Sequence, residues 1–309
     1  MPLFLSESDV AALVDMPTII GELESVFAAE ARGETFNLPR HRFNKGAAKL
    51  NVMLAGDTTS ARHAVRAYGT IGSSVSHIYL YGRDGLLAIV EARLLSAMRT
   101  GAASAVAVKR LAAPDAGTIG LVGAGRQAET QLTAIAAVRP VREVLAYARN
   151  CDNLEAFCAR MEKLMGVPVR PVASAQAACS GADIVVAATN AKSPVVFADW
   201  LKPGAHVVTM GANAADRKEV DLKMIEQASF IVTDDLAQAR IEAGEFIELD
   251  RAGSFDWTRI STLAQLVAKP PVSTGGLTIF KSLGAAIEDL ASSSYVYDEA
   301  LKRGLGRTL

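Results

Sequence analysis

The sequence is poor in cysteine and histidine and has no long apolar run. Its 309 residues include three cysteines and four histidines. No cysteines form a CxxC pair and the histidines are scattered, so neither a disulfide framework nor a metal site is predicted. The chain does not open with a basic segment followed by an apolar one, and no run approaches the roughly 18 apolar residues that span a bilayer. We therefore expect free thiols, no metal, no membrane association and a cytoplasmic protein.

Neither sign of charge is in excess. The formal net charge is −1, which predicts neither a nucleic-acid footprint nor a polybasic membrane patch. Half of the residues are hydrophobic, and a chain of this length can form about two domains with substantial cores. A protein that acts on a small molecule is the expectation that remains.

The periodicity of apolar residues changes along the chain. Residues 6–33 show helical spacing that begins at Ser6, whereas residues 37–91 form short strand-like runs of a mostly antiparallel sheet, with a hairpin turn at RDG. A helix follows over residues 91–113, and APDAG at residues 113–117 breaks it. Strands and helices then alternate, and residues 278–304 are predicted as one long helix.

This alternation is typical of a doubly wound parallel sheet. The prediction is an α/β protein with a Rossmann-type domain at residues 116–284 and a smaller α+β domain. The smaller domain would combine residues 1–115 with residues 285–309.

The motif GAGRQA lies between a predicted strand and a predicted helix. Gly123 would permit the tight turn, Gly125 the approach of a pyrophosphate to backbone N–H groups, and Ala128 close packing of helix on strand. The cofactor-binding residues predicted here are Gly123, Ala124, Gly125, Arg126, Gln127 and Ala128. A tight turn that binds no nucleotide is the structural alternative.

The end of the second strand of this unit bears on the choice of cofactor. NAD sites usually place Asp or Glu about 20 residues beyond the glycines, but here the strand ends in Ala148, Arg149 and Asn150. Arg149 could pair with a 2′-phosphate, which favours NADP(H) over NAD(H). Alternatively, Arg149 is a solvated loop charge and Asp152 serves the ribose.

Arg99 lies in a helix of mostly apolar or very small residues, where an unpaired cation would be costly. One interpretation is a guanidinium group that binds a substrate carboxylate. The structural alternative is an ion pair, either with Glu91 or with an acid elsewhere.

Several stretches together resemble the ornithine cyclodeaminase/μ-crystallin family. They are AMRTGAAS at residues 97–104, GLVGAGRQA at 120–128, KPGAH at 202–206, and TIFKSLG at 278–284 followed by Glu288 and Asp289. The resemblance implies a homodimer, a substrate and dimerisation domain beside a Rossmann domain, a nicotinamide cofactor, and a small amino or imino acid held by basic side chains.

The resemblance also implies roles for single positions. Arg99 and Arg40 match arginines of the substrate domain, and Arg99 would bind the substrate carboxylate. The cofactor set would gain Thr100 near the phosphates, Thr189 and Asn190 beneath the cofactor, and Met210, Gly211 and Lys281.

Two positions depart from the cyclodeaminase pattern. Arg66 stands where the family has a lysine, and arginine is poorly suited to pass a proton. Asn213 stands where cyclodeaminases carry an aspartate, and an amide cannot act as a general base. Arg66 and Asn213 can both still form hydrogen bonds to a substrate, but neither side chain can transfer a proton near neutral pH.

The first functional hypothesis is therefore an NAD(P)H-dependent reductase of a cyclic imino acid such as Δ1-pyrroline-2-carboxylate or Δ1-piperideine-2-carboxylate. Run in reverse, the same site would oxidise an amino acid. Arg40, Arg66 and Arg99 would bind the carboxylate, and Asn213 would orient the imine nitrogen or a water. Two alternatives remain: an ornithine cyclodeaminase with another base such as Asp216, and a protein that holds NADPH with little turnover.

Overall fold

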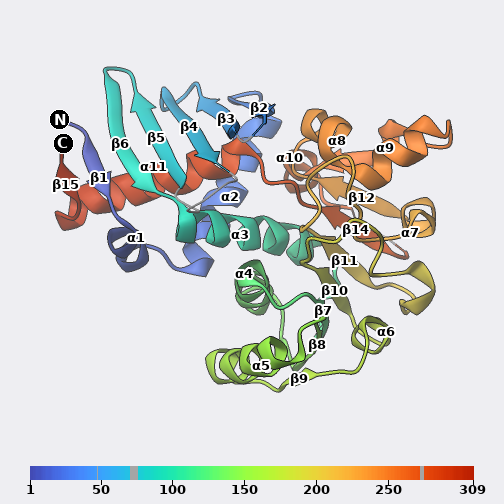
Figure 1. The fold of residues 1–309 in the computed structure, drawn as a ribbon. Coiled ribbons are helices and arrows are strands. Elements are labelled where there is room, and N and C mark those ends of the chain that lie inside the picture. The colour runs from blue at the N-terminus through green and yellow to red at the C-terminus, as the bar shows by residue number, and fades with distance from the viewer. Residues whose placement is uncertain (47, 70–75, 272–274) are drawn as a thin grey trace. The chain divides into compact units, whose positions relative to one another are not determined.

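The structure, a computed structural model, describes residues 1–46, 48–69, 76–271 and 275–309. The chain divides into two compact units (Figure 1). Unit 1 comprises Met1–Ala103 and Gly284–Leu309, and unit 2 comprises Ser104–Leu283. The first boundary thus lies within a helix, 12 residues before the predicted domain limit at residue 115. The predicted domain limits stay a prediction, because compactness alone does not define a domain that folds independently.

Unit 1 is built on a mixed sheet of seven strands, ordered β15-β1-β6-β5-β4-β3-β2. Strand β1 pairs with β6 in parallel, and the remaining neighbours are antiparallel, so the predicted antiparallel block is confirmed. The strands are β1 Leu3–Leu5, β2 Thr35–Lys45, β3 Ala48–Asp57, β4 Arg62–Gly69, β5 Ser76–Gly82, β6 Gly85–Glu91 and β15 Arg307–Thr308.

Four helices accompany this sheet, and α3 continues into unit 2. They are α1 Glu7–Leu13, α2 Met16–Ala31, α3 Arg93–Leu111 and α11 Ala286–Arg303. Helix α11 runs across the strands from β2 to β6, and α2 packs against α11 (Figure 1). The first turn of α11 therefore lies over the strands that carry Arg40 and Arg66.

The single N-terminal helix expected over residues 6–33 is in fact two helices. Ser6 caps α1 through a hydrogen bond with Asp9 N, as the predicted start at Ser6 requires. Helix α1 ends at Leu13, and Asp15 caps α2 by accepting from Thr18 N, with Pro17 in its first turn. Apolar spacing continues through the break, which is why periodicity alone merged the two helices.

Unit 2 contains a sheet of eight strands, ordered β13-β12-β14-β11-β10-β7-β8-β9, in which every pair is parallel. The predicted doubly wound sheet is confirmed. Its strands are β7 Thr118–Val122, β8 Glu143–Tyr147, β9 Val169–Pro171, β10 Ile184–Ala187, β11 His206–Thr209, β12 Phe230–Thr233, β13 Ile260–Thr262 and β14 Thr278–Lys281. The chain order reverses between β7 and β10, the position where such sheets bind ligands.

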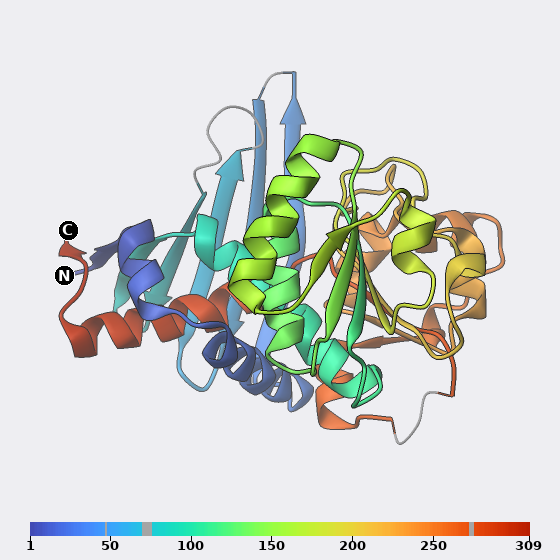
Figure 2. The same ribbon diagram turned by 90° about the horizontal axis from the view of Figure 1, so that it is seen from below.

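Helices cover both faces of this sheet, with α4 and α5 on one face and α6 on the other (Figures 1 and 2). The elements are α4 Arg126–Ala136, α5 Cys151–Met165, α6 Ala175–Cys179, α7 Leu222–Gln227, α8 Leu236–Glu242, α9 Gly244–Arg251 and α10 Leu263–Ala268, with the short 3-10 helices η1 Ala198–Trp200 and η2 Trp257–Arg259. Within this core Val185, Val207 and Ile279 are completely buried.

The long helix expected from residue 278 is wrong in its first part. Residues 278–281 form β14, which pairs with both β11 and β12. A short apolar run of β-branched and aromatic residues fits a buried parallel strand as well as a helix. Helix α11 begins only at Ala286, after Gly284 adopts a φ of +77°.

Among the described residues, no helix has the length and apolar character needed to cross a membrane. Within the same residues, no group of three or more His, Cys, Asp or Glu side chains could hold a metal ion.

Candidate active site

The glycine-rich loop joins β7 to α4 at the switch point of the parallel sheet. Gly123 has a φ of +106°, and a Cβ there would lie 2.3 Å from the carbonyl oxygen of Ala188, so only glycine fits. Its N–H donates to Tyr147 O at 2.8 Å. Ala128 is completely buried where α4 packs on the sheet.

The N-terminus of α4 is suited to an anion. Gly125 is its N-cap, and no side chain in the described part of the chain caps it. A Cβ at Gly125 would have no atom within 4 Å, and Arg126 is exposed beside it. Exposed helix N–H groups with a positive dipole end bind phosphates, so these residues fit a dinucleotide.

Arg149 and Asn150 follow β8, next to this loop. Both side chains are exposed, and Asn150 caps α5 by accepting from Asn153 N at 3.0 Å. Asn150 therefore has a helix-capping role, while the Arg149 side chain faces solvent. The side chain of Asp152, the alternative ribose ligand, lies outside the described residues.

The ends of β10 and β11 approach each other closely. A Cβ at Gly211 would lie 1.7 Å from Thr189 O, so glycine is required for the contact. Met210 is buried, Thr189 is half-buried and Asn190 is exposed. This contact brings the predicted cofactor residues of the two strands together.

A buried glutamate that the sequence reasoning missed joins these strand ends. Glu219 accepts hydrogen bonds from Thr189, Thr209, Gly211 and Ala212 at 2.6–3.1 Å. Burial raises its pKa, against which the charge of Lys281 and the donated hydrogen bonds act. Since these partners all donate to its oxygens, Glu219 is suited to be a carboxylate rather than a neutral acid.

Lys281, predicted to bind the cofactor, is completely buried. Its ammonium lies 3.1 Å from the carboxylate of Glu245, which also accepts from Glu219 N at 3.0 Å. We call Glu219, Glu245 and Lys281 the strand-end cluster. The Lys281 side chain is thus engaged inside unit 2, where it compensates buried negative charge.

Asn213 lies in the loop after β11, two residues beyond Gly211, and is partly exposed. Asp216 lies in an exposed turn of the same loop. The loop that follows β11 therefore carries an amide at position 213.

Arg40 and Arg66 come from strands of unit 1, and both are buried. The register of β2 on β3 shifts between Leu38 and His41, and such irregularities re-aim side chains. Arg40 lies within the shifted stretch and donates to Gly284 O at 2.9 Å. Arg66 donates to Ser76 Oγ at 3.0 Å and stacks over the Tyr68 ring.

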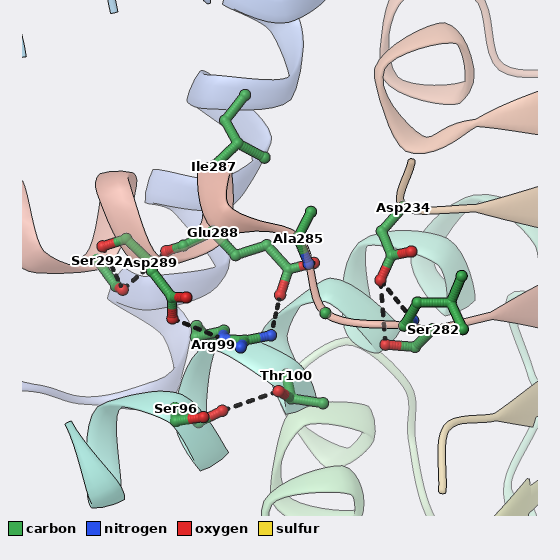
Figure 3. A network of polar contacts seen from close by, with 12 residues as sticks. Ser96, Arg99, Thr100, Asp234, Ser282, Ala285, Ile287, Glu288, Asp289 and Ser292 are labelled. Carbon is green, nitrogen blue, oxygen red and sulfur yellow. Dashed lines mark hydrogen bonds and ion pairs between the residues drawn. The ribbon is translucent and has the colours of Figure 1, made fainter. Parts of the chain in front are cut away.

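Arg99 is paired with two acids of α11, toward which it points in Figure 3. Its Nη1 lies 2.7 Å from Glu288 Oε2, and its Nε lies 3.0 Å from Asp289 Oδ1. Asp289 Oδ1 is also 3.2 Å from Arg66 Nη1. We call Arg40, Arg66, Arg99, Glu288 and Asp289 the arginine cluster.

The charges within this cluster do not cancel. Burial disfavours the charged form of Arg99, but Asp289 and Glu288 outweigh it and raise its pKa, whereas burial lowers the pKa of Arg66 despite Asp289. Both groups stay cationic near neutral pH, because arginine starts far above it. Counted over these five side chains alone, three guanidinium groups and two carboxylates leave one positive charge in excess, which favours an anion as ligand.

The local structure at the start of α11 fixes this arrangement. Glu288 accepts from Ala285 N at 3.2 Å, and Asn37 accepts from Ile287 N at 3.1 Å. A Cβ at Gly284 would lie 2.7 Å from Arg99 Nη1. Thr100 is buried and donates to Ser96 O at 2.8 Å (Figure 3), so its hydroxyl serves α3 itself.

Arg99 thus forms the structural ion pair that was the alternative to binding a substrate carboxylate. The acid is not Glu91, whose carboxylate accepts from Glu7 N at 2.7 Å, but two residues nearly 190 positions away. Glu288 and Asp289 lie in the first turn of the observed helix α11, but the predicted helix began at residue 278, so the sequence reasoning did not mark them as first-turn acids.

Comparison with known proteins places the chain beside imino-acid reductases. Residues 1–304 match the ornithine cyclodeaminase/mu-crystallin family. A Delta(1)-pyrroline-2-carboxylate reductase of Bacillus cereus is 34% identical over 227 residues, which cover 72% of this chain and 70% of that protein. Ketimine reductase mu-crystallin of Mus musculus is 34% identical over 214 residues, covering 69% and 65% respectively.

The fold of the whole chain is also that of a solved relative. The Delta(1)-pyrroline-2-carboxylate reductase of Thermococcus litoralis, in complex with NADH and L-proline, matches with a TM-score of 0.93 and 31% identity over 99% of this chain and 100% of that one. The chain belongs to the ornithine cyclodeaminase/mu-crystallin family.

Proposed function

We propose that the protein is an NAD(P)H-dependent reductase of a small cyclic imino acid of the Δ1-pyrroline-2-carboxylate or Δ1-piperideine-2-carboxylate type. The observation that carries this proposal is an amide, Asn213, in the loop after β11, in a chain with a buried arginine cluster of net positive charge. Such a protein can hold a carboxylate but has no carboxylate base at position 213. The relatives support the same reaction, since two of them are named Delta(1)-pyrroline-2-carboxylate reductase.

The proposed reaction requires residues that bind the substrate carboxylate and a residue that orients the imine nitrogen. When bound, the nicotinamide cofactor supplies a hydride to the imine carbon. Arg40, Arg66 and Arg99 bind the substrate carboxylate by charge-assisted hydrogen bonds. Asn213 orients the imine nitrogen or a water. The substrate enters as an iminium that solvent has already protonated, so addition of hydride gives the neutral amine without a proton from the protein.

Cyclodeamination is the competing reaction. It requires an amine of ornithine to be deprotonated within the site, and a carboxylate is the natural base. Asp216 is exposed in a turn, and Glu288 and Asp289 are engaged with arginines. Asp216 therefore stays the alternative base to be tested.

A paired assay tests the proposal. Purified protein is incubated with NADPH or NADH and each cyclic imino acid, and separately with L-ornithine and trace NAD⁺, while absorbance at 340 nm and ammonia are followed. Stoichiometric loss of the reduced cofactor with the imino acid is expected. Ammonia release from ornithine without net cofactor change would refute the reductase, and tight NADPH binding without turnover would favour a cofactor-holding protein.

The variant Asn213→Asp tests the role of the amide. It restores the acid that cyclodeaminases carry at this position, so ornithine-dependent ammonia release should appear or rise. Asp216→Asn serves as the matched control and should leave both reactions unchanged.

We propose NADP(H) as the preferred cofactor, with NAD(H) as the alternative. The support is the exposed Arg149 directly beyond β8, next to the glycine-rich loop. A guanidinium group there can form a bidentate contact with a 2′-phosphate. The bound cofactor of the Thermococcus litoralis relative is NADH. The ratio of the affinities of this protein for NADPH and NADH therefore tests the proposed preference for NADP(H).

We also propose a homodimer formed through the edge of the unit 1 sheet. Phe36, Leu38 and Phe43 of the edge strand β2 are 39–59% exposed, and Phe43 pairs in register with the exposed Leu50 of β3. Large apolar side chains on an edge strand indicate a covered surface. Sedimentation analysis should find a dimer that Phe43→Asp weakens, whereas a monomeric wild-type protein would contradict the proposal.

A further inference from the structure

We infer that Glu219 is a positioning residue that fixes the Thr189 and Gly211–Asn213 segments in the conformation needed for catalysis. The inference rests on the proposed function in one respect only, namely that these strand ends receive the nicotinamide end of the cofactor. Neither the motifs nor the resemblance pointed to this residue. It comes from the loop after Asn213 and folds back beneath it.

The hydrogen bonds of Glu219 divide between the two strand ends. Its Oε1 accepts from Thr189 N at 2.6 Å and from Thr189 Oγ1 at 2.8 Å. Its Oε2 accepts from Thr209 Oγ1 at 3.0 Å, Gly211 N at 2.6 Å and Ala212 N at 3.1 Å. One carboxylate thus satisfies five donors and ties the loop after β10 to the loop after β11.

No ladder hydrogen bond can replace these contacts. Strand β10 ends at Ala187 and β11 at Thr209, so the Thr189, Gly211 and Ala212 N–H groups lie beyond the paired strands. Buried N–H groups need an acceptor. The close approach of Gly211 to Thr189 O brings both segments within reach of a single side chain.

The rest of the strand-end cluster supports Glu219 as an anion. Glu219 is completely buried, as are Glu245 and Lys281. The Lys281 ammonium pairs with Glu245, and Glu245 accepts from Glu219 N. This places a compensating charge in the same buried region and fixes the backbone of Glu219, so that its side chain is aimed at the strand ends.

The consequence for the site concerns Asn213. Ala212 N is held by Glu219, and Asn213 is the next residue, so the direction in which its amide leaves the chain depends on that hydrogen bond. Glu219 does not need to touch the substrate to affect the reaction. Its loss should lower kcat more than it raises KM, because a carboxylate bound by the arginine cluster in unit 1 does not depend on this loop.

Glu219→Gln is the direct test, with Glu248→Gln as the matched control. Glutamine keeps the size of the side chain but turns an NH₂ group toward N–H donors on one side. Glu248 is a largely exposed partner of Lys218, and its substitution should change nothing. Amide hydrogen exchange of the cofactor-free protein is measured over residues 188–191 and 210–213, together with NAD(P)H binding and kinetics.

In Glu219→Gln these amides should exchange at least about tenfold faster, since hydrogen bonds to a charged group are lost, while exchange in the core of β7 and β8 stays unchanged. Thr209→Val and Thr209→Ser form a second pair that is useful if Glu219→Gln does not fold. The valine should speed exchange at residues 210–213 and the serine should restore it.

Unchanged exchange at these amides in Glu219→Gln, or equal exchange in the two Thr209 variants, would overturn the inference. A uniform rise across unit 2 would also overturn it, because that result indicates a merely structural role. Absence of imino-acid reduction by the wild-type protein would refute the proposed function instead, and it would leave the exchange result standing.

Discussion

Asp289→Asn is expected to destabilise the protein far more than the same change at a neighbouring ion pair. The Asp289 side chain is 1% exposed and accepts from Arg99 Nε at 3.0 Å and Arg66 Nη1 at 3.2 Å. It therefore holds two buried guanidinium groups with one carboxylate. Asparagine preserves the shape and one acceptor but removes the charge, which leaves the arginine cluster with two positive charges in excess.

The magnitude follows from burial. Breaking a buried ion pair by removing one partner costs about 3–5 kcal/mol, because the other charge stays buried and uncompensated. Glu288 still neutralises part of the charge on Arg99 at 2.7 Å, so the lower end, about 3 kcal/mol, is expected. Asp298 on the same helix pairs with Arg62 at 2.7 Å but is 43% exposed, and Asp298→Asn should cost less than about 1 kcal/mol.

Equilibrium unfolding in urea of the wild type and both variants measures these differences. The KM for the imino acid should also rise in Asp289→Asn, since Arg66 and Arg99 lose the group that orients them. If Asp289→Asn loses no more stability than Asp298→Asn, the ion pairs of the cluster are not held as the structure shows them, and the reasoning fails.

Three further outcomes are expected. Gly284→Ala should cost at least about 1 kcal/mol and raise KM, because residue 284 has a φ of +77° and the new Cβ would meet Arg99; wild-type KM and stability would contradict this. Burial holds the pKa of His206 at about 3, below its ordinary 6.5, so as pH falls the unfolded state takes up the proton first. The free energy of unfolding should therefore drop by about 2 kcal/mol between about pH 8 and about pH 5. Urea unfolding at several pH values should show this drop in the wild type and in the exposed-site control His63→Gln, but not in His206→Gln. Arg149→Ala should raise the Kd of NADPH at least about tenfold and leave that of NADH unchanged in fluorescence titrations; equal weakening of both would remove the 2′-phosphate contact.

The parallel sheet could be predicted because its strands are short, apolar and bounded by helices or glycine. The same reasoning failed at residues 278–281, where TIFK precedes a real helix and the apolar run fits either structure. Residues 278–281 form a strand because they pair with β11 on one side and β12 on the other. These pairings are set by the tertiary fold and cannot be read from the local sequence. The division of residues 6–33 into two helices depended instead on Asp15 and Pro17, signals that are legible in the sequence but that continuous apolar spacing obscured.

The sequence indicated Arg99 because a cation among very small residues needs a partner, but it could not identify that partner. Glu288 and Asp289 lie about 190 residues away, and only the packing of α11 across the sheet joins them to α3. Glu219 could not be found in the same way, since KEVD in a polar loop looks like a solvated turn. Its burial arises because the loop folds back under β10 and β11, which local sequence does not encode.

Counted over their named side chains, the two buried clusters carry excess charge of opposite sign, and this difference bears on which ligand each cluster is suited to bind. The arginine cluster has three cations against two anions, so a bound carboxylate completes its neutralisation. The strand-end cluster has two anions, Glu219 and Glu245, against Lys281 alone, and its donors are already taken up by Glu219. Among the described residues, the N–H groups of Thr189, Gly211 and Ala212 already donate to Glu219, so this cluster is poorly suited to a carboxylate ligand. The excess charge of the arginine cluster thus supports the proposal that Arg40, Arg66 and Arg99 bind the carboxylate of a substrate.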